Sequence, residues 1–314
     1  MFHVGPMIVS DVPLADTAPV ARPGKLWSVL QFPMTRLVVA ALPLLAVMGA
    51  TELAIVTLGL AAGGMTSSLI ALAGGLVSVA VYAGCVRWIE RRRLVELGGV
   101  CAAGELGGGF AVGFGLFVVT VGLLVLIGVG RVDGGDGLAA IVPWLLWVAG
   151  TATSEEIVFR GVLFRILEER LGTWISLALT AALFGGLHAT GANASIASSL
   201  AIAIEAGVLL AAAYAASRRL WLPIGLHAGW NLAQLGVLGV QRPGHATHGV
   251  WSSRFTGPAL LSGGDWGPEI SIVAVGACLA AAVVLLVLAQ RHGRIVPPFW
   301  SRRTRGRSMR RVAP

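Results

Sequence analysis

The chain is poor in charged residues and in cysteine. Only 12% of its 314 residues are charged, whereas 56% are hydrophobic and the mean hydropathy is +0.83. These values exclude an ordinary soluble globular domain and indicate a polytopic membrane protein. The three cysteines, Cys85, Cys101 and Cys278, are scattered and form no Cys-x-x-Cys pair. A disulfide framework and a thiolate zinc site are therefore not expected.

Apolar runs long enough to cross a bilayer as helices occur eight times, since about 17 to 25 residues are needed for one crossing. The sequence therefore predicts an all-α membrane bundle of about eight transmembrane helices in one domain, 37–290. Residues 1–36 contain two aspartates and several prolines and are expected to be a disordered cytoplasmic segment rather than a cleaved signal peptide. Residues 291–314 form a basic tail. The eight runs are 37–62, 65–89, 107–130, 138–167, 173–189, 196–216, 220–240 and 270–290.

The net charge of +8 does not indicate nucleic-acid binding, because the basic residues follow the ends of the predicted helices. If eight spans alternate, every one of these basic segments lies on the same side of the membrane, and the other side holds only Arg131, Arg242 and Arg254. The positive-inside rule then predicts a multi-pass plasma-membrane protein with both termini cytoplasmic. The lipid bilayer is the expected partner of the basic tail, through anionic headgroups. The basic groups are Arg22, Lys25 and Arg36; Arg91 to Arg93; Arg165 and Arg170; Arg218 and Arg219; and eight arginines after residue 290.

Three polar clusters interrupt the fourth, fifth and seventh spans. A charged side chain near the centre of a bilayer costs roughly 2.5 to 3.5 kcal/mol, so a cluster of them calls for a functional reason. The default reason is a buried active site or a transport path. The clusters are Glu155-Glu156-x-x-x-Arg160, Phe184-x-x-x-His188 and His227-x-x-x-Asn231.

Residue spacing predicts that these clusters meet between helices four, five and seven. Gly172 is the expected turn of a helical hairpin, with Glu156 sixteen residues before it and His188 sixteen after it. Both then lie about 24 Å from the turn, at the same depth. His227 and Asn231 are four residues apart and share a helix face. We expect the site to lie in the cytoplasmic half of the bilayer.

These residue types suit the hydrolysis of an amide bond. Glu155 can act as a general base on a water, with His188 sharing or orienting the proton, while His227 and Asn231 suit a tetrahedral oxyanion. Glu156 is a further catalytic candidate, although its spacing from Arg160 favours a structural ion pair. Glu155, His188 and His227 would equally satisfy three ligand positions of a catalytic zinc ion. The sequence leaves the metal-free and Zn²⁺ mechanisms open.

The ordered triplet resembles the CPBP family of intramembrane proteases, which contains the type II CAAX prenyl endopeptidases and the bacteriocin-processing and immunity proteins. The resemblance covers about 143–236 and implies that Glu155 is catalytic, that His188 and His227 are essential and that Asn231 supports them. Members are often labelled metalloproteases, yet His-Glu-x-x-His is absent here. A metal-free glutamate mechanism has also been argued for the family, so no cofactor is firmly expected.

The leading hypothesis is an intramembrane endopeptidase that cleaves a membrane-associated protein or peptide near the cytoplasmic membrane boundary. A non-catalytic immunity or scaffold protein of the same fold is an alternative. A small transporter is another, although the paired inverted repeats expected of one are not visible. Glu52 and Glu205 belong to no motif, so packing and a minor polar path are equally open for them. Gly109-x-x-x-Gly113 indicates close helix packing.

Overall fold

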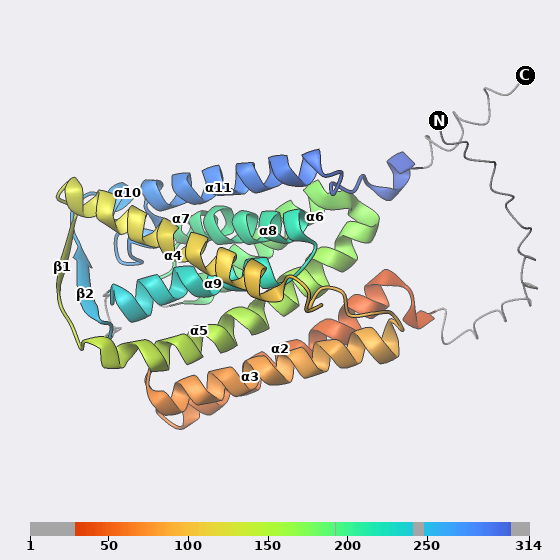
Figure 1. The fold of residues 1–314 in the computed structure, drawn as a ribbon, viewed down its shortest axis with the longest axis horizontal. Helices are drawn as coiled ribbons and strands as arrows, with labels where there is room; N and C mark the ends of the chain where they lie inside the picture. The colour runs from red at the N-terminus through yellow and green to blue at the C-terminus, as the bar shows by residue number, and fades with distance from the viewer. Residues whose placement is uncertain (1–28, 192, 241–247, 303–314) are drawn as a thin grey trace, which may run out of the picture.

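The computed structural model describes residues 29–191, 193–240 and 248–302, which form a bundle of helices aligned along one axis (Figure 1). The predicted all-α class is confirmed. In chain order the long elements are α2 (Pro33–Thr57), α3 (Met65–Gly84) continued by η1 (Cys85–Ile89), α4 (Ala102–Leu126), α5 (Ile141–Glu156), η3 (Ile157–Phe164), α6 (Arg165–Leu187), α7 (Ile196–Ile202), η5 (Ala203–Val208), α8 (Leu209–Ser217), α9 (Trp221–Asn231), η6 (Leu232–Val237) and α11 (Ile272–Arg291).

The predicted spans correspond to these helices, but their number is not confirmed as eight. Within the described residues, six helical stretches are long and apolar enough to cross a membrane. One of them, Leu138–Leu187, contains the turn at Gly172, and the stretch formed by α9 and η6 is not among the six. The first helix begins at Pro33 rather than at residue 37, so the end of the segment expected to be disordered is helical. Residues 1–28 and 303–314 lie outside the described residues.

Short elements cover the end of the bundle opposite Gly172. Strands β1 (Gly130–Gly134) and β2 (Trp251–Phe255) pair in antiparallel register there (Figure 1). After β2 the chain forms α10 (Ala259–Ser262) and the 3-10 turn η7 (Pro268–Ile270), and η7 contacts α4, α7 and α11. The connection into the last helix therefore folds inward between the helices.

Gly172 forms the predicted hairpin turn, with φ 78° and ψ 170°, a left-handed conformation that favours glycine. A side chain there would also meet Val296, because an added Cβ would lie 2.7 Å from its carbonyl oxygen. Thr173 does not cap the second arm through its side chain. Its N–H donates to the carbonyl of Val296 at 2.9 Å, and its hydroxyl oxygen accepts from Val296 N–H at 2.8 Å. The segment after α11 is thus attached to the hairpin turn.

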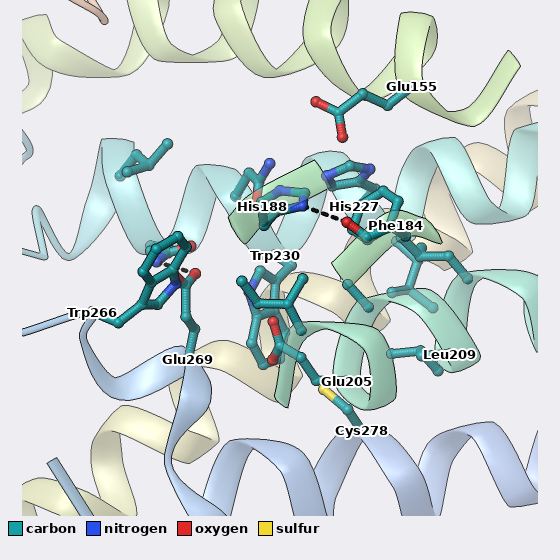
Figure 2. A pocket seen from close by; sticks show the side chains of 17 residues that line it. Glu155, Phe184, His188, Glu205, Leu209, His227, Trp230, Trp266, Glu269 and Cys278 are labelled. Carbon is teal, nitrogen blue, oxygen red and sulfur yellow. Dashed lines mark hydrogen bonds between the residues drawn. The ribbon is translucent and has the colours of Figure 1, made fainter. Parts of the chain in front are cut away.

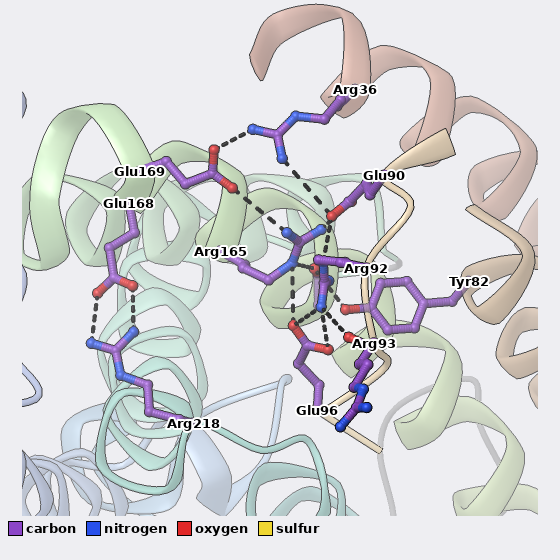
Figure 3. Close-up of polar contacts among 11 residues, drawn as sticks. Arg36, Tyr82, Glu90, Arg92, Arg93, Glu96, Arg165, Glu168, Glu169 and Arg218 are labelled. Atoms are coloured by element: carbon purple, nitrogen blue, oxygen red, sulfur yellow. Dashed lines mark hydrogen bonds and ion pairs between the residues drawn. The ribbon is translucent and has the colours of Figure 1, made fainter. Parts of the chain in front are cut away.

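The arginine-rich segments gather at the end of the bundle that carries this turn (Figure 3). Glu90 lies at the centre, with a side chain 3% exposed, and pairs with Arg165 and, at 2.6 Å, with Arg92. Arg36 at the start of α2 pairs with Glu169 beside the hairpin turn. The expectation that these segments share one end is confirmed. The face of the membrane on which this end lies stays a prediction.

Lowering the pH should weaken the ion pairs around Glu90. Burial raises the pKa of Glu90, but the charges and hydrogen bonds of Arg165 and Arg92 outweigh burial, so the pKa lies below its usual value of 4.5. The stabilisation is therefore complete above pH 4.5 and is lost as the pH falls through the lower pKa of the folded state. We expect the unfolding temperature of the detergent-solubilised protein to drop below that pH. Glu90→Gln should flatten the drop, whereas Glu52→Gln, at an exposed position of α2, should not.

Helix α9, which carries the third motif, packs directly on α4 through glycine. A Cβ at Gly113 would overlap the carbonyl oxygen of Leu226, and one at Gly229 would overlap that of Phe110. The helices therefore touch backbone to backbone, as the Gly109-x-x-x-Gly113 spacing predicts. Because Gly229 faces α4, His227 two residues earlier is turned away from α4, toward the interior of the bundle.

A matched pair of substitutions tests this contact. Gly113→Ala should destabilise the protein by about 1 to 3 kcal/mol, because the added methyl group forces α4 and α9 apart. Gly115→Ala on the same helix has nothing within 4 Å of the new Cβ and should be neutral or slightly stabilising. Thermal unfolding of both variants measures the difference. Equal unfolding temperatures would show that the close contact between α4 and α9 does not contribute to stability.

Candidate active site

The first motif lies where α5 changes to the π-helical segment η3. Glu155 and Glu156 are the last residues of α5, and η3 starts at Ile157. Consecutive helical residues point about 100° apart, so the two carboxylates face different surroundings. Glu156 is fully buried, whereas Glu155 is half-buried and lines a cavity.

That cavity brings the three motifs together. Glu155 from α5, His188 from the end of α6, and His227 and Asn231 from α9 all line it (Figure 2). Its volume is about 200 Å³. One water needs roughly 10 to 15 Å³ on this measure, so there is room for a water and part of a larger molecule. The predicted convergence of helices four, five and seven is therefore present in the structure.

A backbone carbonyl orients His188. Its Nδ1 lies 2.8 Å from the carbonyl oxygen of Phe184, four residues earlier, and its ring lies 4.9 Å from the Phe184 ring, centroid to centroid (Figure 2). A carbonyl oxygen only accepts hydrogen bonds, so Nδ1 must carry the proton. In the neutral imidazole Nε2 then keeps the lone pair. The Phe-x-x-x-His spacing thus fixes the ring so that Nε2 can accept a proton or a water hydrogen.

Glu156 and Arg160 form a buried ion pair, and Glu156 contacts His227. Oε1 of Glu156 lies 2.7 Å from Nη1 of Arg160 and 2.9 Å from Nδ1 of His227. Nη2 of Arg160 donates to the carbonyls of Ala206 and Gly207, each at 3.2 Å, and the side chain is 1% exposed. The predicted ion pair is confirmed. Glu156 does not line the cavity and instead contacts the His227 ring, so a direct catalytic role for Glu156 stays a prediction.

The three proposed zinc ligands do not form a metal site as the structure places them. Among the residues with described positions, no group of three His, Cys, Asp or Glu side chains lies close enough together to hold a metal ion. Glu155, His188 and His227 share the cavity wall without converging on one point. The described geometry does not support the metalloprotease assignment, and a role for Zn²⁺ stays a prediction.

The cavity has a second set of polar side chains that the motifs do not contain. Glu205, Gln234, Trp266 and Glu269 line the cavity, and all four lie outside the three motifs. The sequence feature that points to Glu205 is a carboxylate in the middle of an apolar span. Glu269 lies in a connection between spans, so neither spacing nor hydropathy could place it against the site.

These residues bear on the expected position of the site in the half of the bundle nearest the arginine-rich end, which stays a prediction. Trp266 and Glu269, however, come from the connection after β2, at the other end of the molecule, and they line the same cavity as His227. Counting residues along straight helices could not anticipate that this connection folds inward. The cavity therefore extends from the middle of the helices toward the end that carries β1 and β2.

Comparison with known proteins supports a protease family for the segment that builds the site. Residues 137–233 match the family described as type II CAAX prenyl endopeptidase Rce1-like, and this segment contains all three motifs. No curated protein and no solved structure matches the chain. The resemblance drawn from the motifs is confirmed over this segment, which closely coincides with the expected 143–236.

Proposed function

We propose that this multi-pass membrane protein is an intramembrane endopeptidase, because residues 137–233 match the family described as type II CAAX prenyl endopeptidase Rce1-like. The observation that carries the proposal is the convergence of Glu155, His188, His227 and Asn231 on one cavity. A carboxylate, two imidazoles and an amide are the groups that water activation and oxyanion stabilisation require.

Glu155 and His188 activate the water in this proposal. The Glu155 carboxylate takes a proton from a water in the cavity as the water oxygen attacks the carbonyl carbon of the scissile peptide bond. Nε2 of His188, whose lone pair is free because Nδ1 bonds Phe184, accepts the second hydrogen of that water and orients it. Apolar side chains make up much of the cavity wall, so both interactions are stronger than they would be in bulk water.

His227 and Asn231 stabilise the oxyanion that the attack creates. Glu156 accepts from Nδ1 of His227 and favours the imidazolium form, in which Nε2 donates to the oxyanion. The Asn231 amide supplies a second donor. When the tetrahedral intermediate collapses, the carbon–nitrogen bond breaks and the leaving amine takes the proton held by Glu155. The products are a carboxylic acid and an amine, and Glu155 returns to its starting form.

The substrate in this proposal is a membrane-associated protein or peptide. An apolar bundle around the cavity favours a chain that enters from the membrane. The plasma-membrane location, the cytoplasmic position of both termini and a cleaved bond near the cytoplasmic boundary remain predictions from the distribution of arginines. The reach of the cavity toward the β1 and β2 end favours a bond deeper in the membrane than that boundary.

A reconstituted cleavage assay tests the proposed function. The purified protein in lipid vesicles is mixed with a panel of membrane-anchored peptides, with and without a prenylated C-terminal motif, and products are identified by mass spectrometry. We expect cleavage at a defined bond by the wild type and none by Glu155→Ala. The same products from both proteins would reject the assignment.

A further inference from the structure

A groove lies at the arginine-rich end of the bundle and shares no lining residue with the active-site cavity. Its described lining runs from Trp174, just after the hairpin turn, and Gln290, near the end of α11, to Arg302 in the segment that follows α11. The volume is about 690 Å³, within the roughly 300 to 1,000 Å³ that is typical of small-molecule sites. The proposed hydrolysis uses none of these residues.

Hydrogen bonds fix the segment that forms one wall of this groove. At Val296 the main chain accepts from the N–H of Thr173 at 2.9 Å and donates to the Thr173 hydroxyl oxygen at 2.8 Å. Farther along, Nε of Arg302 donates to the carbonyl oxygen of Pro297 at 2.7 Å. This bond orients the guanidinium group. A wall that is already in place loses little conformational freedom when a ligand binds.

The groove carries positive charge. Its described lining contains Arg302 and neither Asp nor Glu. The two acids beside the hairpin turn, Glu168 and Glu169, are paired with Arg218 and Arg36 (Figure 3). An anionic group in the groove would therefore meet an arginine rather than a carboxylate. Arginine suits a phosphate in particular, because its planar group can donate two parallel hydrogen bonds to phosphate oxygens.

Exposed aromatic side chains place the groove at the depth of the lipid headgroups. Trp174, Phe299 and Trp300 are 54%, 44% and 50% exposed, and the guanidinium of Arg170 lies 5.9 Å from the centre of the Phe299 ring. Tryptophan is enriched where the hydrocarbon of a membrane meets water. Helix α11 is apolar enough to cross a membrane and ends at Arg291. The groove thus begins where this span ends and extends beyond it.

We infer that this groove binds one anionic phospholipid of the membrane, with the phosphate on Arg302 and the glycerol and upper acyl chains against Trp174 and Ile295. The competing occupant is the chain's own tail, 303–314. Those residues include five arginines and neither Asp nor Glu, so the tail would bring positive charge to a positive groove. A free phosphate ion would bond the arginine but leave the apolar part of the groove unfilled. The inference is independent of the proposed function, because it concerns a separate site.

Binding of defined lipids tests the inference. The purified protein in a neutral detergent is titrated with phosphatidylglycerol or with phosphatidylcholine of identical acyl chains, and native mass spectrometry gives the Kd of the first bound lipid. Phosphatidylglycerol should bind at least about tenfold more tightly, the size typical of one charge-assisted hydrogen bond. It should also raise the unfolding temperature, because it binds the folded state. Inorganic phosphate at the same concentration should leave that temperature unchanged.

Two variants assign the preference to the groove. Arg302→Gln should remove most of it, whereas Arg291→Gln should keep it, because Arg291 is exposed at the end of α11 but does not line the groove. The inference is overturned if the wild type binds both lipids equally, a result that needs no variant to fold. It is also overturned if inorganic phosphate stabilises the protein as phosphatidylglycerol does. Equal losses in the two variants would overturn it too, since they would show attraction by the basic segment as a whole.

Discussion

Alanine at Glu155 or at His188 should each lower kcat/KM by roughly 10²- to 10⁴-fold, the range for loss of a general acid–base group. The double variant should be no slower than the slower single variant. Both side chains act on the same water in the same step, so once one is absent the other has little left to contribute. Initial rates in vesicles with an identified substrate measure all three effects.

The matched control for this pair is Glu52→Ala, which removes a carboxylate of α2 outside the cavity and should retain wild-type rates. Each variant should also keep the wild-type unfolding temperature within a few degrees, since neither Glu155 nor His188 belongs to the buried ion pair. Additive losses in the double variant would mean that the two residues act in separate steps. The roles assigned to Glu155 and His188 in activating one water would then be wrong.

Arg160→Ala should destabilise the protein by about 3 to 5 kcal/mol, the cost of leaving one partner of a buried ion pair alone. Glu156 is fully buried, and Arg160 also bonds the carbonyls of Ala206 and Gly207, so the substitution removes the arginine charge paired with Glu156 and the side-chain donor of two carbonyls. The free energy of unfolding in detergent is the measurement. A loss below about 0.5 kcal/mol, the size typical of a neutral surface change, would contradict the structural role.

A second variant separates stability from catalysis in this cluster. The double substitution Glu156→Leu/Arg160→Met removes both charges and should be more stable than Arg160→Ala, because no buried charge is left unpaired. It should still lose most of its activity, since Nδ1 of His227 loses its acceptor. Recovered stability together with full activity would show that Glu156 does not act through His227.

The helical segments were predictable because hydropathy and length dominate in a membrane chain. The starts at Met65 and Ile196 agree with the sequence, and the turn at Gly172 follows from glycine between two polar helix ends. The antiparallel pairing of β1 with β2 was not predictable in this way. The strands are separated by four helical segments, and no local pattern specifies that contact.

The relative positions of some candidate site residues could be predicted from their spacing. Residues four apart on one helix share a face, so His227 and Asn231 could be placed together from spacing alone. The contact of Glu156 with His227 joins two helices and depends on how they pack, as does the place of Glu205 on the cavity wall. Trp266 and Glu269 could not be placed at the cavity from the sequence, because the connection after β2 folds inward and its residues carry no periodic signal.

Glu155 as the base that activates the hydrolytic water is the central claim, and a single-turnover experiment tests it most directly. Excess wild-type protein and excess Glu155→Gln are each mixed with a membrane-embedded substrate, and both the bound fraction and the rate of bond cleavage are followed. Glutamine fills the same space but cannot take the proton. We predict equal binding and a cleavage rate at least about 10²-fold lower for Glu155→Gln. Cleavage by Glu155→Gln at a rate near that of the wild type would contradict the assignment.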